Sequence, residues 1–211
     1  MTARDRTLAA IQGGEPDRIP EVGTDILAVP VDRLADARRN NPDAVILAIV
    51  HSPLTRARIR NQQIFDLLES DPESGNTELD GLVMASQIQI NDAIHGGADG
   101  VCYVIEGAYP SASTPMQYGG FLLERDRALL SSANPAPANM VLIAGEDEPY
   151  IDFVSDLPAA IFAWDARSSW TPTQVRGLRS GALAANSSDA DILLTDRALQ
   201  DILGAQGATC L

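Results

Sequence analysis

The chain has 211 residues, 45% of them hydrophobic and 21% charged, as is usual for a soluble globular protein with a substantial core. No apolar run reaches the roughly 20 residues of a membrane span, and the net charge of −14 disfavours nucleic acid and anionic membranes as partners. All 15 basic residues are arginine, which excludes Schiff-base and phosphate-loop mechanisms that need lysine.

The cysteines and the start of the chain bear on its location and ligands. Cys102 and Cys210 are far apart and have no metal-ligand spacing. The opening MTARDRTLAAIQGGEPDR is too polar for a signal peptide. We therefore expect a cytoplasmic protein with no metal and no cofactor, folded as one domain over residues 1–211.

The first half of the chain alternates between helix and strand patterns. A continuous aliphatic run predicts a strand buried on both faces at residues 44–50. Apolar spacing predicts the helices, and DPESGN reads as a loop. The helices are expected at residues 2–12, 31–39, 54–68 and 79–95, and the loop at 71–76.

The second half continues the alternation. Strands are expected at 101–105, 140–144, 160–164 and 181–185, and helices at 121–131, 149–157 and 175–178. A Gly-, Ser- and Pro-rich loop fills residues 106–120, and the tail from residue 189 holds either a strand and a helix or one helix.

Six or seven strands that alternate with helices predict a mostly parallel α/β sheet with right-handed crossovers. A complete eight-stranded barrel typically needs about 250 residues. We therefore expect a β/α barrel of TIM type that is abbreviated or incomplete.

Six polar residues lie next to apolar runs and are candidates for a site at the strand ends. His51 follows the strand at 44–50 and is expected to act as an acid or base near neutral pH, unless it only bonds local backbone. The other candidates, as ligand-binding residues, are Glu106, Asp165, Arg167 and Asn186, together with Asp25. Asp165 and Arg167 form either an ion pair or, through Arg167, a carboxylate-binding site.

Three arginines alternate just after His51. Arg56 and Arg60 share a helix face, with Arg58 between them in sequence. They form either a site for an anionic ligand or acidic partner, or a solvated face.

Several stretches occur in the order of motifs in a known family. RDRTLAAIQGGEPDRIP matches an N-terminal helix and Gly-Glu-Pro turn, and AIVHSPLTRARI a strand ending in a Pro-x-Thr turn. QINDAIHGGADGVCYVIEG matches a Gly-Ala-Asp passage into a strand, and NMVLIAGEDEPYIDFVSDLPAAIFAWDAR a Trp-Asp strand end. Together they resemble the uroporphyrinogen decarboxylase superfamily, which includes tetrapyrrole decarboxylases and cobalamin-linked methyltransferases.

This resemblance implies a barrel acting on a carboxylated tetrapyrrole-type molecule. The family's Phe-Ser-Asp-Ile-Leu aspartate corresponds to Asp25, which would face pyrrole nitrogens and act with His51 as the catalytic pair. The family's arginine-rich grip is absent, and its tyrosine and serine fall at Ile59 and Gly107. The methyltransferase His-x-Cys zinc motif would fall near residues 142–144, which hold no metal ligand.

Three functions follow from these observations. The first is a decarboxylase-like protein that binds or converts a small carboxylated molecule. The second is a non-catalytic scaffold or partner protein on the same fold, expected to form a homo-oligomer because an incomplete barrel leaves sheet edges to cover. The third is a cobalamin-linked methyltransferase-like protein that lacks the zinc motif.

Overall fold

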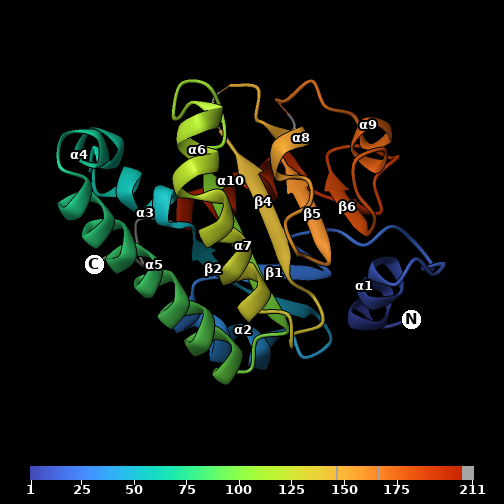
Figure 1. The fold of residues 1–211 in the computed structure, drawn as a ribbon. Helices are drawn as coiled ribbons and strands as arrows, with labels where there is room; N and C mark the ends of the chain where they lie inside the picture. The colour runs from blue at the N-terminus through green and yellow to red at the C-terminus, as the bar shows by residue number, and fades with distance from the viewer. Residues whose placement is uncertain (146, 166, 206–211) are drawn as a thin grey trace.

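The computed structural model describes residues 1–145, 147–165 and 167–205. Its centre is one sheet of seven parallel strands in the order β1-β2-β3-β4-β5-β6-β7, with helices between them (Figure 1). This is the mostly parallel α/β architecture expected from the sequence. No helix in the described part of the chain is long and apolar enough to cross a membrane.

The strands are short and their residues are mostly buried, as expected for a sheet covered on both faces. They are β1 (Ile26–Val29), β2 (Val45–His51), β3 (Gly100–Glu106), β4 (Met140–Ala144), β5 (Ile161–Trp164), β6 (Ala182–Ala185) and β7 (Ile192–Leu193).

Helices connect the successive strands from β1 to β6, and two more precede β1 and follow β7. They are α1 (Ala3–Ile11), the 3-10 helix η1 (Val31–Arg33), α2 (Leu34–Asn40), α3 (Pro53–Ile59), α4 (Ile64–Ser70), α5 (Pro72–His95), α6 (Pro115–Phe121), α7 (Leu123–Ser132), α8 (Ile151–Val154), α9 (Pro172–Arg176) and α10 (Asp196–Gly204).

The two edges of the sheet are joined by isolated bridges instead of an eighth strand. Glu21 pairs with Leu193 of β7, and Val22 pairs with Ile26 of β1. The stagger of the strands can be measured by moving from each residue to its partner on the next strand. Starting from Ala44 beside β2 and passing once around the sheet, this path returns beside β2 at Ser52. The two positions are about eight residues apart. Eight is the shear of a complete β/α barrel. The chain therefore keeps the stagger of the full barrel with an abbreviated set of strands.

Buried side chains form two clusters, one on each face of the curled sheet. The outer cluster joins outward strand residues such as Tyr103 and Phe162 to helices α2 to α9. The inner cluster joins inward strand residues such as Val104 and Leu142 to α1 and α10. The inward positions of β4, β5 and β6 are mostly small, including Ala144, Ala163 and Ala184.

Helix α10 packs on the inner face of the sheet. Its buried residues Ala198, Leu199 and Ile202 belong to the inner cluster, whereas the helices that follow β1 to β5 pack on the outer cluster. In Figure 1, α10 lies on the side of β4 away from α6 and α7. The tail left open by the sequence is therefore a strand followed by a helix, and that helix covers the inner face near the strand ends.

The prediction of one helix at 54–68 is wrong, because this segment forms two helices, α3 and α4, separated by a turn. Asn61 lies between α3 and α4 with φ 54, the left-handed conformation that asparagine tolerates better than most residues. A helix cannot continue through this backbone conformation.

The prediction of a loop at 71–76 is also wrong, because α5 begins in this segment. Asp71 caps α5 by accepting a hydrogen bond from the Ser74 backbone N–H, and Pro72 occupies the first turn. Gly75 is needed inside the helix because a Cβ there would lie 2.7 Å from the Leu68 Cα. Residues that usually break helices here start one.

The long loop expected at 106–120 holds helix α6. Thr114 and Gln117 form a capping box ahead of it, with Pro115 in the first turn. Because α6 extends to Phe121, helix α7 begins two residues later than the helix expected at 121–131.

Candidate functional site

Three of the predicted site residues lie in one row across the carboxyl edge of the sheet. Glu106 is paired with Ala144 of β4. The register of β4 with β5 and of β5 with β6 continues that row to Asp165 and Asn186. At the usual strand spacing, Asp165 is ~5 Å from Asn186 and ~10 Å from Glu106, measured along the backbone row. Each lies two residues after an inward-facing position of its strand, so the three continue the inward side at the mouth of the barrel.

His51 lies one layer deeper than this row. It pairs with Val104, two residues before Glu106, and its side chain is fully buried. Burial and, second, the charge of Arg56 lower the pKa of His51 to about 4. The imidazole is therefore neutral at pH 7, and the expected acid–base role near neutral pH finds no support in its surroundings.

Asp25 lies at the opposite end of the sheet. It precedes Ile26, which pairs with the first residue of β2, whereas His51 is the last residue of β2. Six strand residues separate those two levels by ~20 Å. The structure therefore does not bring Asp25 to His51, and the pair expected from the sequence does not form one polar centre.

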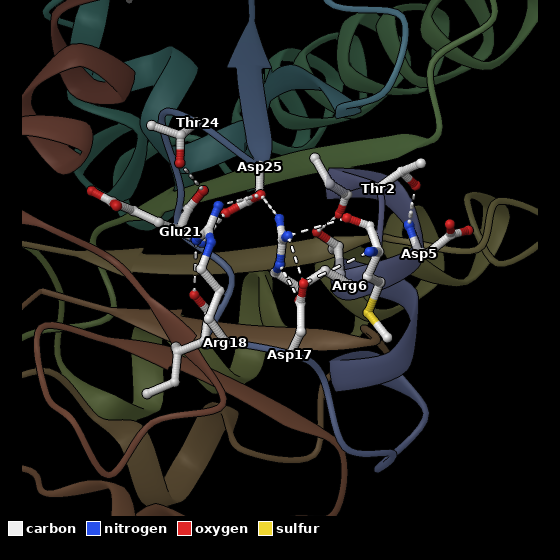
Figure 2. Close-up of polar contacts among 12 residues, drawn as sticks. Thr2, Asp5, Arg6, Asp17, Arg18, Glu21, Thr24 and Asp25 are labelled. Carbon is white, nitrogen blue, oxygen red and sulfur yellow. Dashed lines mark hydrogen bonds and ion pairs between the residues drawn. The ribbon is translucent and has the colours of Figure 1, made fainter.

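The carboxylate of Asp25 is held by two arginines, as Figure 2 shows. Arg6 Nη1 is 2.5 Å from Asp25 Oδ1, and Arg18 Nη1 is 2.8 Å from Oδ2. The Glu21 backbone N–H also donates to Asp25 Oδ2, and Arg6 extends the network to Asp17. This hydrogen bond from Arg6 lowers the pKa of Asp17 to about 2. The network ties α1 to the segment that closes the barrel.

Asp165 and Arg167 form the ion pair that was one of the two readings of the sequence. Arg167 Nη2 lies 2.5 Å from Asp165 Oδ2, and its Nε donates to both carboxylate oxygens. Arg167 Nη2 also donates to the Gly145 carbonyl. Asp165 is buried whereas the Arg167 side chain is 60% exposed. The guanidinium therefore neutralises a buried carboxylate at the mouth.

A pocket of about 420 Å³ lies between this ion pair and α10. We call it the mouth pocket; its lining residues are Asp165, Arg167, Asn186, Asp196, Leu199 and Gln200. Asn186 Nδ2 donates to Asp196 Oδ1 at 3.1 Å, which links β6 to the first turn of α10. Three of the six residues chosen from the sequence thus share one pocket, while Asp25, His51 and Glu106 are not among the described residues that line it.

Sequence reasoning missed Asp196, Leu199 and Gln200, because the tail had no settled structure. A signal was present: Thr195 and Asp196 open a helix whose apolar residues recur at Ala198, Leu199 and Ile202. No group of three or more His, Cys, Asp or Glu side chains in the described ranges has the arrangement of a metal site.

Comparison with known proteins gives a fold but not a family. No model of a protein family matches the sequence, and no curated protein matches it. A solved structure, a methyltransferase from Methanosarcina mazei, is similar with a TM-score of 0.72 and 13% identity, over 87% of this chain and 82% of that one. At that identity the likeness shows that the two chains share a barrel-type fold.

Proposed function

We propose that the chain is a methyltransferase-like protein of the uroporphyrinogen decarboxylase superfamily that binds a small molecule in the mouth pocket. The observation that supports this most is the position of Asp165, Arg167 and Asn186. They line one pocket at the carboxyl edge, where α/β barrels bind ligands, in a fold shared with a methyltransferase. The proposal follows the third function in the sequence analysis, and the comparisons lend no support to the decarboxylase or tetrapyrrole readings.

The charges of the mouth pocket favour a ligand that is cationic or rich in hydrogen-bond donors. The lining residues carry two carboxylates, of Asp165 and Asp196, and one guanidinium, of Arg167. The Asn186 and Gln200 amides add both donors and acceptors. A net charge of −14 on the whole chain also attracts cations. The pocket volume suits a ligand of modest size.

In this proposal the residues have distinct roles. Asp196 and Asn186 contact the ligand, and Leu199 supplies an apolar wall. Arg167 pairs with the buried Asp165 carboxylate and with the Gly145 carbonyl, so its role is to hold this wall in place and not to bind a substrate carboxylate.

Binding to this pocket is expected to depend on Asp196 but not on Asp201. Both lie on α10, but only Asp196 is among the residues that line the pocket. The Asp201 side chain is 77% exposed, and its Oδ2 lies 4.0 Å from Arg197 Nε. Asp196→Asn should weaken binding of trimethylammonium at least about fivefold, because a charge–charge contact is lost. Asp201→Asn should leave binding within about twofold. Saturation-transfer NMR with trimethylammonium, dimethyl sulfide and methanol as probes measures this.

The three probes share a methyl group and differ in charge, so they separate charge recognition from general apolar binding. Equal binding of all three to the parent and to both variants would show that the mouth pocket is not the site. If none of them binds at ~50 mM, the proposed ligand class is wrong.

The second candidate function, a non-catalytic partner protein that forms a homo-oligomer, has its own support in α5. Met84 and Ile88 lie one turn apart on this helix and are 65% and 54% exposed. Light scattering is expected to show a dimer that Met84→Glu weakens, while Met116→Glu on the 87% exposed Met116 of α6 does not. A monomeric parent protein would remove this candidate.

A further inference from the structure

A second cavity, of about 410 Å³, lies on the carboxyl side of the sheet between α3, α4 and α6. It shares no lining residue with the mouth pocket. Its walls come from the helices that follow β2 and from the segment that follows β3, where barrel proteins place ligand sites. The left-handed Asn61 turns the chain from α3 into α4 and so forms one wall.

Arg58 lines this cavity and is held in place by Tyr109. Arg58 Nη2 donates to Tyr109 Oη at 2.9 Å, and its guanidinium carbon is 5.5 Å from the centre of the tyrosine ring. Tyr109 is itself fixed, because its buried ring lies against Gly145, where a Cβ would come within 2.2 Å of the ring. The guanidinium is therefore positioned before any ligand arrives.

The charge environment of Arg58 differs from that of most arginines in the chain. Among the described residues, ten of the 15 arginines form an ion pair with a carboxylate. Within the described residues Arg58 forms none, although acidic residues outnumber basic ones by 29 to 15. A fixed guanidinium on the wall of a cavity, with no carboxylate partner in the described part of the chain, matches the geometry of carboxylate recognition.

The other lining residues narrow the ligand class. Gln63 and Asn61 contribute amides, and Phe65 contributes an aromatic surface. Asp66 adds a negative charge, which disfavours phosphate and other multiply charged anions but suits an amino group. The cavity is thus neutral overall and lined for a molecule with one carboxylate.

We propose that this cavity binds a small monocarboxylate of amino-acid size, with Arg58 as the carboxylate contact and Asp66 facing any amino group. This site is independent of the mouth pocket and of the function proposed for it. The sequence left open whether the arginines after His51 bind an anionic ligand or form a solvated face. The proposal gives the anion-binding role to Arg58 alone, since Arg60 does not line the cavity.

Titration of the full chain with glycine, acetate and inorganic phosphate, followed by NMR, tests the proposal. Glycine and acetate are expected to bind, and phosphate to bind at least about tenfold more weakly. Arg58→Gln should weaken glycine binding at least about tenfold, because the charge-assisted hydrogen bonds are lost. Arg60→Gln makes the same charge change at the exposed C-cap of α3 and should stay within about twofold of the parent.

Two further variants keep the test decisive if Arg58→Gln unfolds. Arg58→Lys keeps the charge but not the two-pronged donor and should weaken glycine binding less than glutamine does. Tyr109→Phe keeps the ring, removes the hydroxyl partner of Arg58 and should also weaken binding. Equal glycine binding by the parent, Arg58→Lys and Tyr109→Phe would overturn the proposal, as would no binding of glycine or acetate by the folded parent, or a preference for phosphate.

Discussion

Asp25→Asn is expected to lower the free energy of unfolding by about 3–5 kcal/mol, because it removes the charge of a buried carboxylate that pairs with two guanidinium groups. The Asp25 carboxylate is 2% exposed and accepts from Arg6, from Arg18 and from the Glu21 backbone N–H. The amide of asparagine offers only one acceptor oxygen to these donors. Urea unfolding followed by circular dichroism measures the loss.

The matched control is Asp36→Asn, which breaks an exposed ion pair with Arg39. The Asp36 side chain is 53% exposed, so its loss should cost no more than about 0.5 kcal/mol. Similar losses in the two variants would mean that the network at Asp25 is not a stabilising element. Ligand binding at the barrel mouth should survive Asp25→Asn at temperatures where the variant is folded, since the two positions lie at opposite ends of the sheet.

The buried Asp126 is expected to make stability fall as pH rises. Its oxygens accept 2.7 Å hydrogen bonds from Tyr103 and Tyr118, and burial, opposed by these two bonds, raises the pKa of Asp126 to about 6. In the unfolded chain the carboxyl titrates near its ordinary value of 3.8. Between those values the folded state holds the proton that the unfolded state has lost, so the unfolding free energy falls by about 2 kcal/mol from pH 4 to pH 7.

Asp126→Asn isolates this effect from the other carboxylates. Asparagine has a similar shape and does not titrate, so the stability difference between parent and variant should change across pH 4–7. Tyr118→Phe removes one hydrogen bond to the carboxylate and should move the window to higher pH. A stability difference that stays flat with pH would contradict the raised pKa of Asp126.

Most of the fold followed from the order of aliphatic runs along the sequence. The strands at 44–50, 101–105 and 140–144 were found within a residue or two, because their apolar side chains are buried on both faces. Helix starts were missed at Asp71 and Thr114, because Pro and Gly were read as breakers instead of cap and first-turn residues.

The positions of the candidate residues in the fold were predicted in part. Position after an apolar run correctly brought Asp165 and Asn186 to one edge, since parallel strands end on the same side. The same rule cannot tell which end of a strand a polar residue occupies, and Asp25 lies before its strand. The buried Asp126 was overlooked, although the sequence indicated its position. Helical spacing places it on the same apolar face as Leu122, Leu129 and Leu130, at and after the start of α7.

The bridge between Glu21 and Leu193 has a consequence for how the chain folds. It joins residues about 170 positions apart, and both α1 and α10 must arrive before the inner cluster is complete. Contacts of such long sequence separation carry a high entropic cost and form slowly. Until they form, the edges of β1 and β7 are open to pairing with other chains. Closure of the ring is therefore the step at which folding competes with aggregation.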